Sequence, residues 1–117
     1  MNMFSVFSSR CHSHNVLEGI SDKWSILLIT CLSGKTLRFG ELKRHLDGIS
    51  AKVLTQTLQK LEKYGFILRN DFGSMPMKVE YSLSDLGQEL NAILTRLTQW
   101  TEANMEKIMA SEQDFLR

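Results

Sequence analysis

Hydrophobic residues recur every three or four positions through much of the chain, which is the spacing of amphipathic helices. A short helix is expected at about residues 14–20. A second helix is expected to begin after Ser21 or Asp22 and to end near Gly34, because Ser and Asp cap helix starts and Gly commonly follows helix ends. Its predicted apolar face consists of Trp24, Leu27, Leu28 and Cys31.

Two further helices are predicted on either side of a tight turn. The shorter helix runs from Phe39 to Leu46, and Ser50 caps a longer helix that continues to Lys63. About three residues separate them, which is the spacing of a helix-turn-helix. We therefore expect a helix-turn-helix at about residues 39–64.

After Gly65 the hydrophobic period changes to two, which predicts a two-stranded hairpin, or wing, at about residues 66–83. The alternation assigns one face of the hairpin to Phe66, Leu68, Val79, Tyr81 and Leu83, and the other to Ile67, Arg69, Lys78, Glu80 and Ser82. A helical stripe then returns at about residues 85–111. The predicted fold is mainly α with a small β-hairpin (α+β), a single winged helix-turn-helix domain over residues 1–117.

The last predicted helix points to a second copy of the chain. If it is unbroken it is about 40 Å long, at 1.5 Å per residue, which is longer than a domain of this size can cover. Its apolar stripe and that of the first helix are therefore our dimer-interface candidates. They are Val16, Leu17, Ile20, Leu90, Ile93, Leu94, Leu97, Trp100 and Ile108. We interpret residues 1–10 as a loose arm or a strand that needs a partner.

Composition narrows the class of protein. With 117 residues, one Pro and 7 Gly, the chain is typical of one ordered domain. Two Cys and the absence of a secretory signal indicate a reducing, cytoplasmic setting, and the longest apolar run is too short to span a membrane. Three His and no nucleophile with an evident base argue against an enzyme. Cys11, His12 and His14 lack the paired spacing of a metal site, so we expect no metal and no cofactor.

The net charge of +1 conceals a division along the chain. Residues 35–69 carry eight basic and three acidic residues, a net charge of +5, whereas residues 80–117 carry three basic and seven acidic residues, a net charge of −4. A basic half built as a helix-turn-helix is typical of DNA binding. The average charge is therefore no argument against a nucleic-acid partner.

The longer helix of the motif has an exposed stripe of Lys and Gln without an acid. Lys neutralises phosphates, and Gln pairs with an adenine edge in the major groove. We expect base reading from Lys52, Thr55, Gln56 and Gln59, with Ser50 and the helix start supporting a phosphate and Lys60 to one side. The candidates for backbone contact are Arg38, Lys43, Arg44, Arg69 and Lys78.

Several ordered motifs resemble the HxlR family of bacterial winged helix-turn-helix regulators, relatives of the MarR group. They are Lys23-Trp24-Ser25-Ile26-Leu27-Leu28, Arg38-Phe39-Gly40-Glu41-Leu42, Gly48-Ile49-Ser50-Ala51-Lys52-Val53-Leu54-Thr55, and Val79-Glu80-Tyr81-Ser82-Leu83-Ser84-Asp85-Leu86-Gly87. The resemblance covers roughly residues 11–101. It implies a cytoplasmic homodimer that binds a palindromic operator in double-stranded DNA, without enzymatic activity.

In some members of that family a cysteine just before the first helix senses electrophiles or oxidants, and Cys11 matches its position. The leading hypothesis is a homodimeric, sequence-specific repressor that responds to a small electrophile or oxidant. The alternative is a winged helix used for protein–protein interaction, in which the basic surface meets an acidic partner protein.

Overall fold

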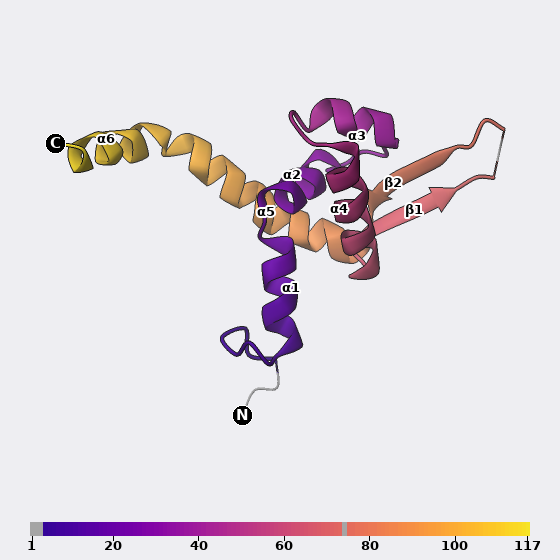
Figure 1. The fold of residues 1–117 in the computed structure, drawn as a ribbon, viewed down its shortest axis with the longest axis horizontal. Coiled ribbons are helices and arrows are strands. Elements are labelled where there is room, and N and C mark those ends of the chain that lie inside the picture. The colour runs from indigo at the N-terminus through magenta and orange to yellow at the C-terminus, as the bar shows by residue number, and fades with distance from the viewer. Residues whose placement is uncertain (1–3, 74) are drawn as a thin grey trace.

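The computed structural model describes residues 4–73 and 75–117 and contains the predicted order of elements (Figure 1). The helices are α1 (His12–Ile20), α2 (Lys23–Cys31), α3 (Phe39–His45), α4 (Ala51–Lys63), α5 (Asp85–Ala103) and α6 (Met105–Phe115). Strands β1 (Ile67–Asp71) and β2 (Val79–Leu83) form an antiparallel hairpin. The mainly helical winged helix-turn-helix architecture expected from the sequence is thus confirmed.

The core lies where α2, α3, α4, α5 and the base of the hairpin meet. The face of α2 that is buried there differs from the predicted one. It consists of Ser25, Leu28, Ile29 and Leu32, which are 0–1% exposed, whereas Trp24, Leu27 and Cys31 are only half-buried. The prediction was right for Leu28 and wrong for full burial of the other three, which pack at the edge of the core. Because α2 is apolar almost all round, the hydrophobic period does not select a face. Ser25 is tolerated in the core because its hydroxyl donates to the carbonyl oxygen of Gly19 at 3.2 Å.

The turn of the helix-turn-helix follows the predicted chemistry. Gly48 has φ +88°, a left-handed conformation that L side chains rarely adopt, and it lets the chain reverse after α3. The Ser50 hydroxyl then accepts a hydrogen bond from the backbone N–H of Val53 at 3.1 Å and so caps α4. Ile49 fills the turn from inside, at 4% exposure. The turn is therefore held by one cap and one buried side chain.

The register of the hairpin corrects the predicted faces of β1. Ile67 pairs with Leu83, and Arg69 pairs with Tyr81. Cross-strand partners share a face, so Ile67, and not Leu68, points into the core. Ile67 is 2% exposed and Leu68 is 49% exposed. The prediction failed because Phe66 is also buried but lies before the strand, so counting the alternation from it shifted the period by one residue.

The predicted C-terminal helix is interrupted at Asn104, which separates α5 from α6. The Asn104 backbone has φ −109° and ψ 9°, and its side-chain amide donates to the carbonyl oxygen of Trp100 at 2.8 Å. Asn side chains that bond nearby backbone in this way compete with the helical pattern. The expectation of one unbroken helix to residue 111 was therefore wrong.

The molecule is extended rather than spherical. Its radius of gyration is 17.0 Å, whereas a compact domain of this length has about 13 Å. Figure 1 shows the cause: α1, the α5–α6 pair and the hairpin project from the core in three directions. Residues 1–3 of the predicted N-terminal arm lie outside the described residues. Residues 4–10 bend back onto α1 of the same chain, where the Ser13 hydroxyl donates to the carbonyl oxygen of Phe4 at 2.7 Å. None of the helices in the described part of the chain is long and apolar enough to cross a membrane.

Candidate nucleic-acid interface

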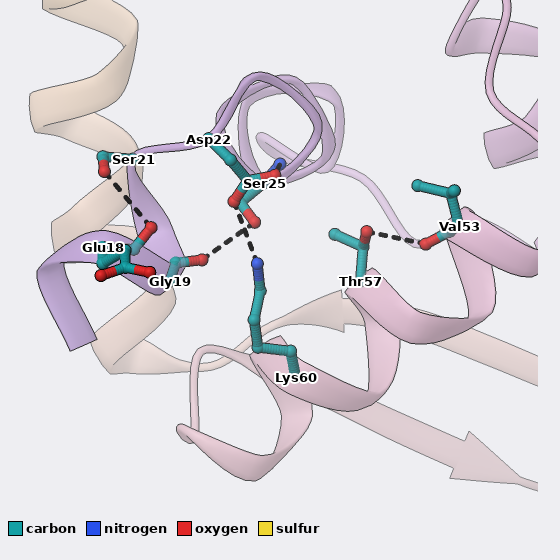
Figure 2. Close-up of polar contacts among 8 residues, drawn as sticks. All are labelled: Glu18, Gly19, Ser21, Asp22, Ser25, Val53, Thr57 and Lys60. Atoms are coloured by element: carbon teal, nitrogen blue, oxygen red, sulfur yellow. Dashed lines mark hydrogen bonds and ion pairs between the residues drawn. The ribbon is translucent and has the colours of Figure 1, made fainter. Parts of the chain in front are cut away.

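Helix α4 divides cleanly into a buried and an exposed face. Its buried residues are Leu54, Thr57, Leu58 and Leu61. Lys52, Thr55, Gln56, Gln59 and Lys63 are exposed on the other side. Thr57 is the one polar residue among those buried on α4, and its hydroxyl donates to the carbonyl oxygen of Val53 at 2.7 Å, as Figure 2 shows. The structure thus brings the predicted base-reading residues together on one open surface.

The side chains on this surface fall into two kinds. Ser50 caps the helix, and the Thr55 hydroxyl donates to the carbonyl oxygen of Ala51 at 2.9 Å, so both already make local hydrogen bonds. Lys52, Gln56 and Gln59 make no side-chain hydrogen bond to any other described residue. Their donors and acceptors are consequently available to an external partner such as a base edge or a phosphate.

Lys60 does not belong to this exposed face. Its ammonium lies 2.9 Å from a carboxylate oxygen of Asp22, and its side chain is only 32% exposed. Partial burial of Asp22 opposes ionisation, but hydrogen bonds from Ser25 and the hydrogen bond and charge of Lys60 outweigh it and lower the pKa of that carboxyl. Lys60 is therefore engaged with the α1–α2 turn.

A hollow of about 430 Å³ separates α4 from the wing. It is lined by Phe39, Thr55, Leu58, Gln59, Glu62, Arg69 and Tyr81. Two helix residues predicted for base reading, Thr55 and Gln59, thus share one concave surface with the wing residue Arg69. Sequence reasoning missed the contribution of Glu62 and Tyr81, although Thr55, Gln59 and Glu62 follow the i, i+4, i+7 spacing of one helical edge.

The cations of the wing are partly neutralised within the chain. Arg69 lies 3.7 Å from an Asp71 carboxylate oxygen, and Lys78 lies 3.4 Å from one of Glu80. The Lys78 ammonium also sits 5.0 Å from the centre of the Phe72 ring, within the range of a cation–π contact. Both pairs are partly exposed and longer than the 2.9 Å contact between Lys60 and Asp22, so a phosphate can replace the carboxylates at small cost.

Helix α3 presents the other three predicted cations at its two ends. Arg38 is the N-cap residue, with its backbone N–H donating to the Glu41 carboxylate at 3.0 Å. Lys43 and Arg44 lie in the last turn, where positive charge also interacts favourably with the helix dipole. All three side chains are exposed, and Lys43 and Arg44 lie at the end of α3 that leads into the turn before α4.

Cys11 is the residue that caps α1, and its surroundings favour the thiolate. Its sulfur lies 3.1 Å from the Ser13 hydroxyl. Hydrogen bonds from that hydroxyl and from the backbone N–H groups of Ser13 and His14 lower the pKa of the Cys11 thiol, although partial desolvation opposes them. Since a hydroxyl has one hydrogen, Ser13 donates either to the Cys11 thiolate or to the Phe4 carbonyl oxygen, which it contacts at 2.7 Å.

Cys31 has the opposite character. Burial raises the pKa of its thiol, and the charge of Lys35 only partly offsets this. Because the thiolate is the reactive species, we expect iodoacetamide at pH 7 to alkylate Cys11 well before Cys31. The rate at Cys11 should also begin to rise at lower pH than the rate at Cys31. Peptide mass spectrometry over a pH series measures both, and equal rates at the two thiols, or a faster Cys31, would contradict the assignment.

The structure separates the predicted dimer-interface residues into three groups. Leu17, Ile93, Leu97 and Trp100 are exposed, by 47%, 64%, 48% and 59%. Val16, Ile20, Leu90 and Ile108 are half-buried. Leu94 is only 7% exposed, because it packs into the core of its own chain. Leu94 is therefore a core residue here, and the exposed group is the unpartnered apolar surface.

The comparisons with known proteins agree with this geometry. Residues 19–109 match the model of the HxlR-like helix-turn-helix family. The chain is 36% identical to the HTH-type transcriptional regulator YtfH of Escherichia coli (strain K12) over 106 residues, which cover 91% of this chain and 84% of that protein.

Two solved structures are similar over most of the chain. The transcriptional regulator ytfH from Salmonella typhimurium has a TM-score of 0.88 at 35% identity, covering 93% of this chain and 97% of that one. The redox regulator HypR in its reduced form has a TM-score of 0.77 at 30% identity, covering 85% and 98%. The chain therefore belongs to the HxlR-like helix-turn-helix family and is a helix-turn-helix transcriptional regulator.

Proposed function

We propose that the protein is a homodimeric repressor that binds a palindromic operator in double-stranded DNA in the cytoplasm. The observation that carries this proposal is the exposed face of α4, where Lys52, Gln56 and Gln59 stand without partners among the described residues. An α-helix fits the major groove, which is about 12 Å wide, and such side chains reach base edges there. The recognition helix in this proposal is α4.

The contacts divide into base reading and positioning. Lys52, Gln56 and Gln59, with Thr55, read the groove, while Ser50 and the N-terminal N–H groups of α4 face a phosphate. Arg69 and Lys78 on the wing and Arg38, Lys43 and Arg44 around α3 hold the backbone. Lys60 is left out of the contact set because Asp22 engages it.

A dimer is supported by the extended shape and by the exposed apolar residues of α1 and α5. Trp100 and Ile93 are more than half exposed although both are large and apolar. Exposed apolar surface of this kind marks an interaction site. A twofold axis along these helices would place the two recognition helices about one DNA turn, roughly 34 Å, apart, which matches a palindromic operator.

A thiol signal is supported by the lowered pKa of Cys11 and by the redox regulator among the similar structures. Modification of Cys11 at the start of α1 changes the local charge and hydrogen bonds next to the proposed dimer helices. Such a modification shifts the population of DNA-binding conformations only as far as it stabilises one conformation more than the other.

The test is a footprint on genomic DNA fragments, made with and without diamide. The native protein should protect one palindromic site without oxidant and release it with oxidant, whereas Cys11→Ser should protect the same site under both conditions. Release by diamide in both proteins would exclude Cys11 as the sensor. Absence of any protected sequence would instead favour a protein-interaction module.

A further inference from the structure

One edge of α4 lies outside the proposed DNA-binding surface and ends at the C-cap residue Tyr64, which also packs against the core. Lys60 and Tyr64, which are one helical turn apart, direct this edge toward the turn between α1 and α2. Lys60 pairs with Asp22 at 2.9 Å. The Tyr64 ring stands edge-on to the ring of His12, with 6.5 Å between the ring centres, and also packs against Gly19. The end of the recognition helix is thus held at two points.

A short chain of hydrogen bonds connects these points (Figure 2). The Ser25 hydroxyl donates to the carbonyl oxygen of Gly19 at 3.2 Å, and the Ser25 backbone N–H donates to one carboxylate oxygen of Asp22 at 3.3 Å. The other carboxylate oxygen of Asp22 accepts from Lys60. The end of α1, the start of α2 and the last turn of α4 are joined through Ser25 and Asp22. We call Gly19, Asp22, Ser25, Lys60 and Tyr64 the α1–α2–α4 junction.

The junction is tightly packed. A Cβ atom on Gly19 would lie 3.1 Å from a ring carbon and 3.3 Å from the hydroxyl of Tyr64, closer than most real contacts. None of the residues of α1 is fully buried, and the helix contacts the core through the half-buried Ile20 at its end. A rigid contact at the end of a weakly anchored helix transmits movement, because packed side chains do not deform continuously.

We propose that the α1–α2–α4 junction positions the recognition helix, so that a displacement of α1 changes the angle at which α4 meets the operator. This inference rests on the proposed DNA-binding function of α4. Asp22, Lys60 and Tyr64 are positioning residues in it and make no contact with DNA.

Asp22→Asn separates positioning from simple electrostatics. The asparagine keeps an oxygen that can cap Ser25 but loses the charge that holds Lys60. By charge alone, removal of an acid strengthens binding to every duplex. Loosening of the recognition helix instead lowers the affinity for the operator more than the affinity for other duplexes. We expect the ratio of operator to scrambled-duplex affinity to fall by about two- to fivefold, the scale of a partly exposed ion pair.

The measurement is fluorescence anisotropy with the footprinted operator and a scrambled duplex of equal length at one salt concentration. Ser21→Ala is the matched control, since among the described residues its hydroxyl bonds only to the Glu18 carbonyl oxygen, three positions earlier. Its affinity ratio should equal that of the native protein. Gly19→Ala, which crowds Tyr64 without changing any charge, should lower the ratio as Asp22→Asn does. Circular dichroism and urea unfolding establish that each variant is folded.

An unchanged ratio in folded Asp22→Asn, or a parallel rise in both affinities, would overturn the positioning role. If Gly19→Ala does not fold, Asp22→Asn decides the question alone. Lys52→Glu distinguishes failure of the junction from failure of the proposed DNA-binding function. If Lys52→Glu loses operator binding while Asp22→Asn keeps the native ratio of operator to scrambled-duplex affinity, only the positioning role of the junction is refuted. If the native protein shows no preference for the operator, the proposed function is refuted, and the role of the junction with it.

Discussion

Lys52→Glu is expected to abolish operator binding while leaving the protein folded. Lys52 is exposed in the first turn of α4 and its side chain makes no hydrogen bond to another described residue, so the fold does not depend on its charge. Loss of one base or phosphate contact costs about 1–3 kcal/mol, and each of the two recognition helices of a dimer loses it. Operator affinity should therefore fall by about 2–6 kcal/mol, before the repulsion between glutamate and phosphate is added.

An electrophoretic shift assay with the footprinted operator measures this effect. Lys107→Glu is the matched control, because it makes the same change in net charge on α6, at the far end of the molecule from the wing (Figure 1). It should bind the operator nearly as tightly as the native protein. Equal affinity of Lys52→Glu and Lys107→Glu would remove α4 from the interface.

Trp100→Glu is expected to convert the dimer into folded monomers. The Trp100 side chain is 59% exposed on α5 beside Leu97 and Ile93, so its loss spares the core of the protomer. In a dimer it would be covered by apolar surface, where a carboxylate is costly to bury without a partner. Monomers bind half-sites independently, without the gain in effective concentration that linked sites provide, which is about 10²–10⁴-fold.

Light scattering coupled to size-exclusion chromatography gives the mass, and the shift assay gives the loss of operator affinity. Gln99→Glu adds a negative charge at the neighbouring exposed position and should remain dimeric. If Trp100→Glu kept the dimeric mass and the native affinity, the proposed interface on α5 would be wrong.

The order of elements could be predicted because its signals are local. Ser50 and Gly48 bound the turn by capping and by backbone conformation, and each acts within a few residues. The exposed and buried faces of α4 were also predictable, since Leu54, Leu58 and Leu61 leave one apolar stripe beside polar positions. The candidate DNA-reading residues follow directly from that stripe.

The errors concern contacts between elements. Lys60 lies at the edge of the polar stripe, and only the tertiary position of Asp22 decides that it turns toward α2. Likewise, the stripe on α5 suggested Leu94 as an interface residue, but the packing of α5 on α2 buries it in the same chain. Hydrophobic periodicity identifies which residues form an apolar face. It does not show whether that face packs against its own chain or against a second copy.

The break at Asn104 and the register of β1 show a second limit of prediction from local sequence patterns. Asn has only a modest local preference against helix, so its effect depends on whether its amide finds the Trp100 carbonyl. At the start of β1, Phe66 just before the strand and Ile67 within it are both buried, and a period of two cannot accommodate both. Here the tertiary structure overrides the local pattern.

Sequence-specific reading of DNA by α4 and the wing is tested most directly by two affinities of the native protein, one for its footprinted operator and one for a scrambled duplex, each over a series of salt concentrations. Both affinities should fall as salt rises, and the operator should be bound at least about 10³-fold more tightly throughout. Equal affinities for the two duplexes at every salt concentration would contradict sequence-specific reading by this surface.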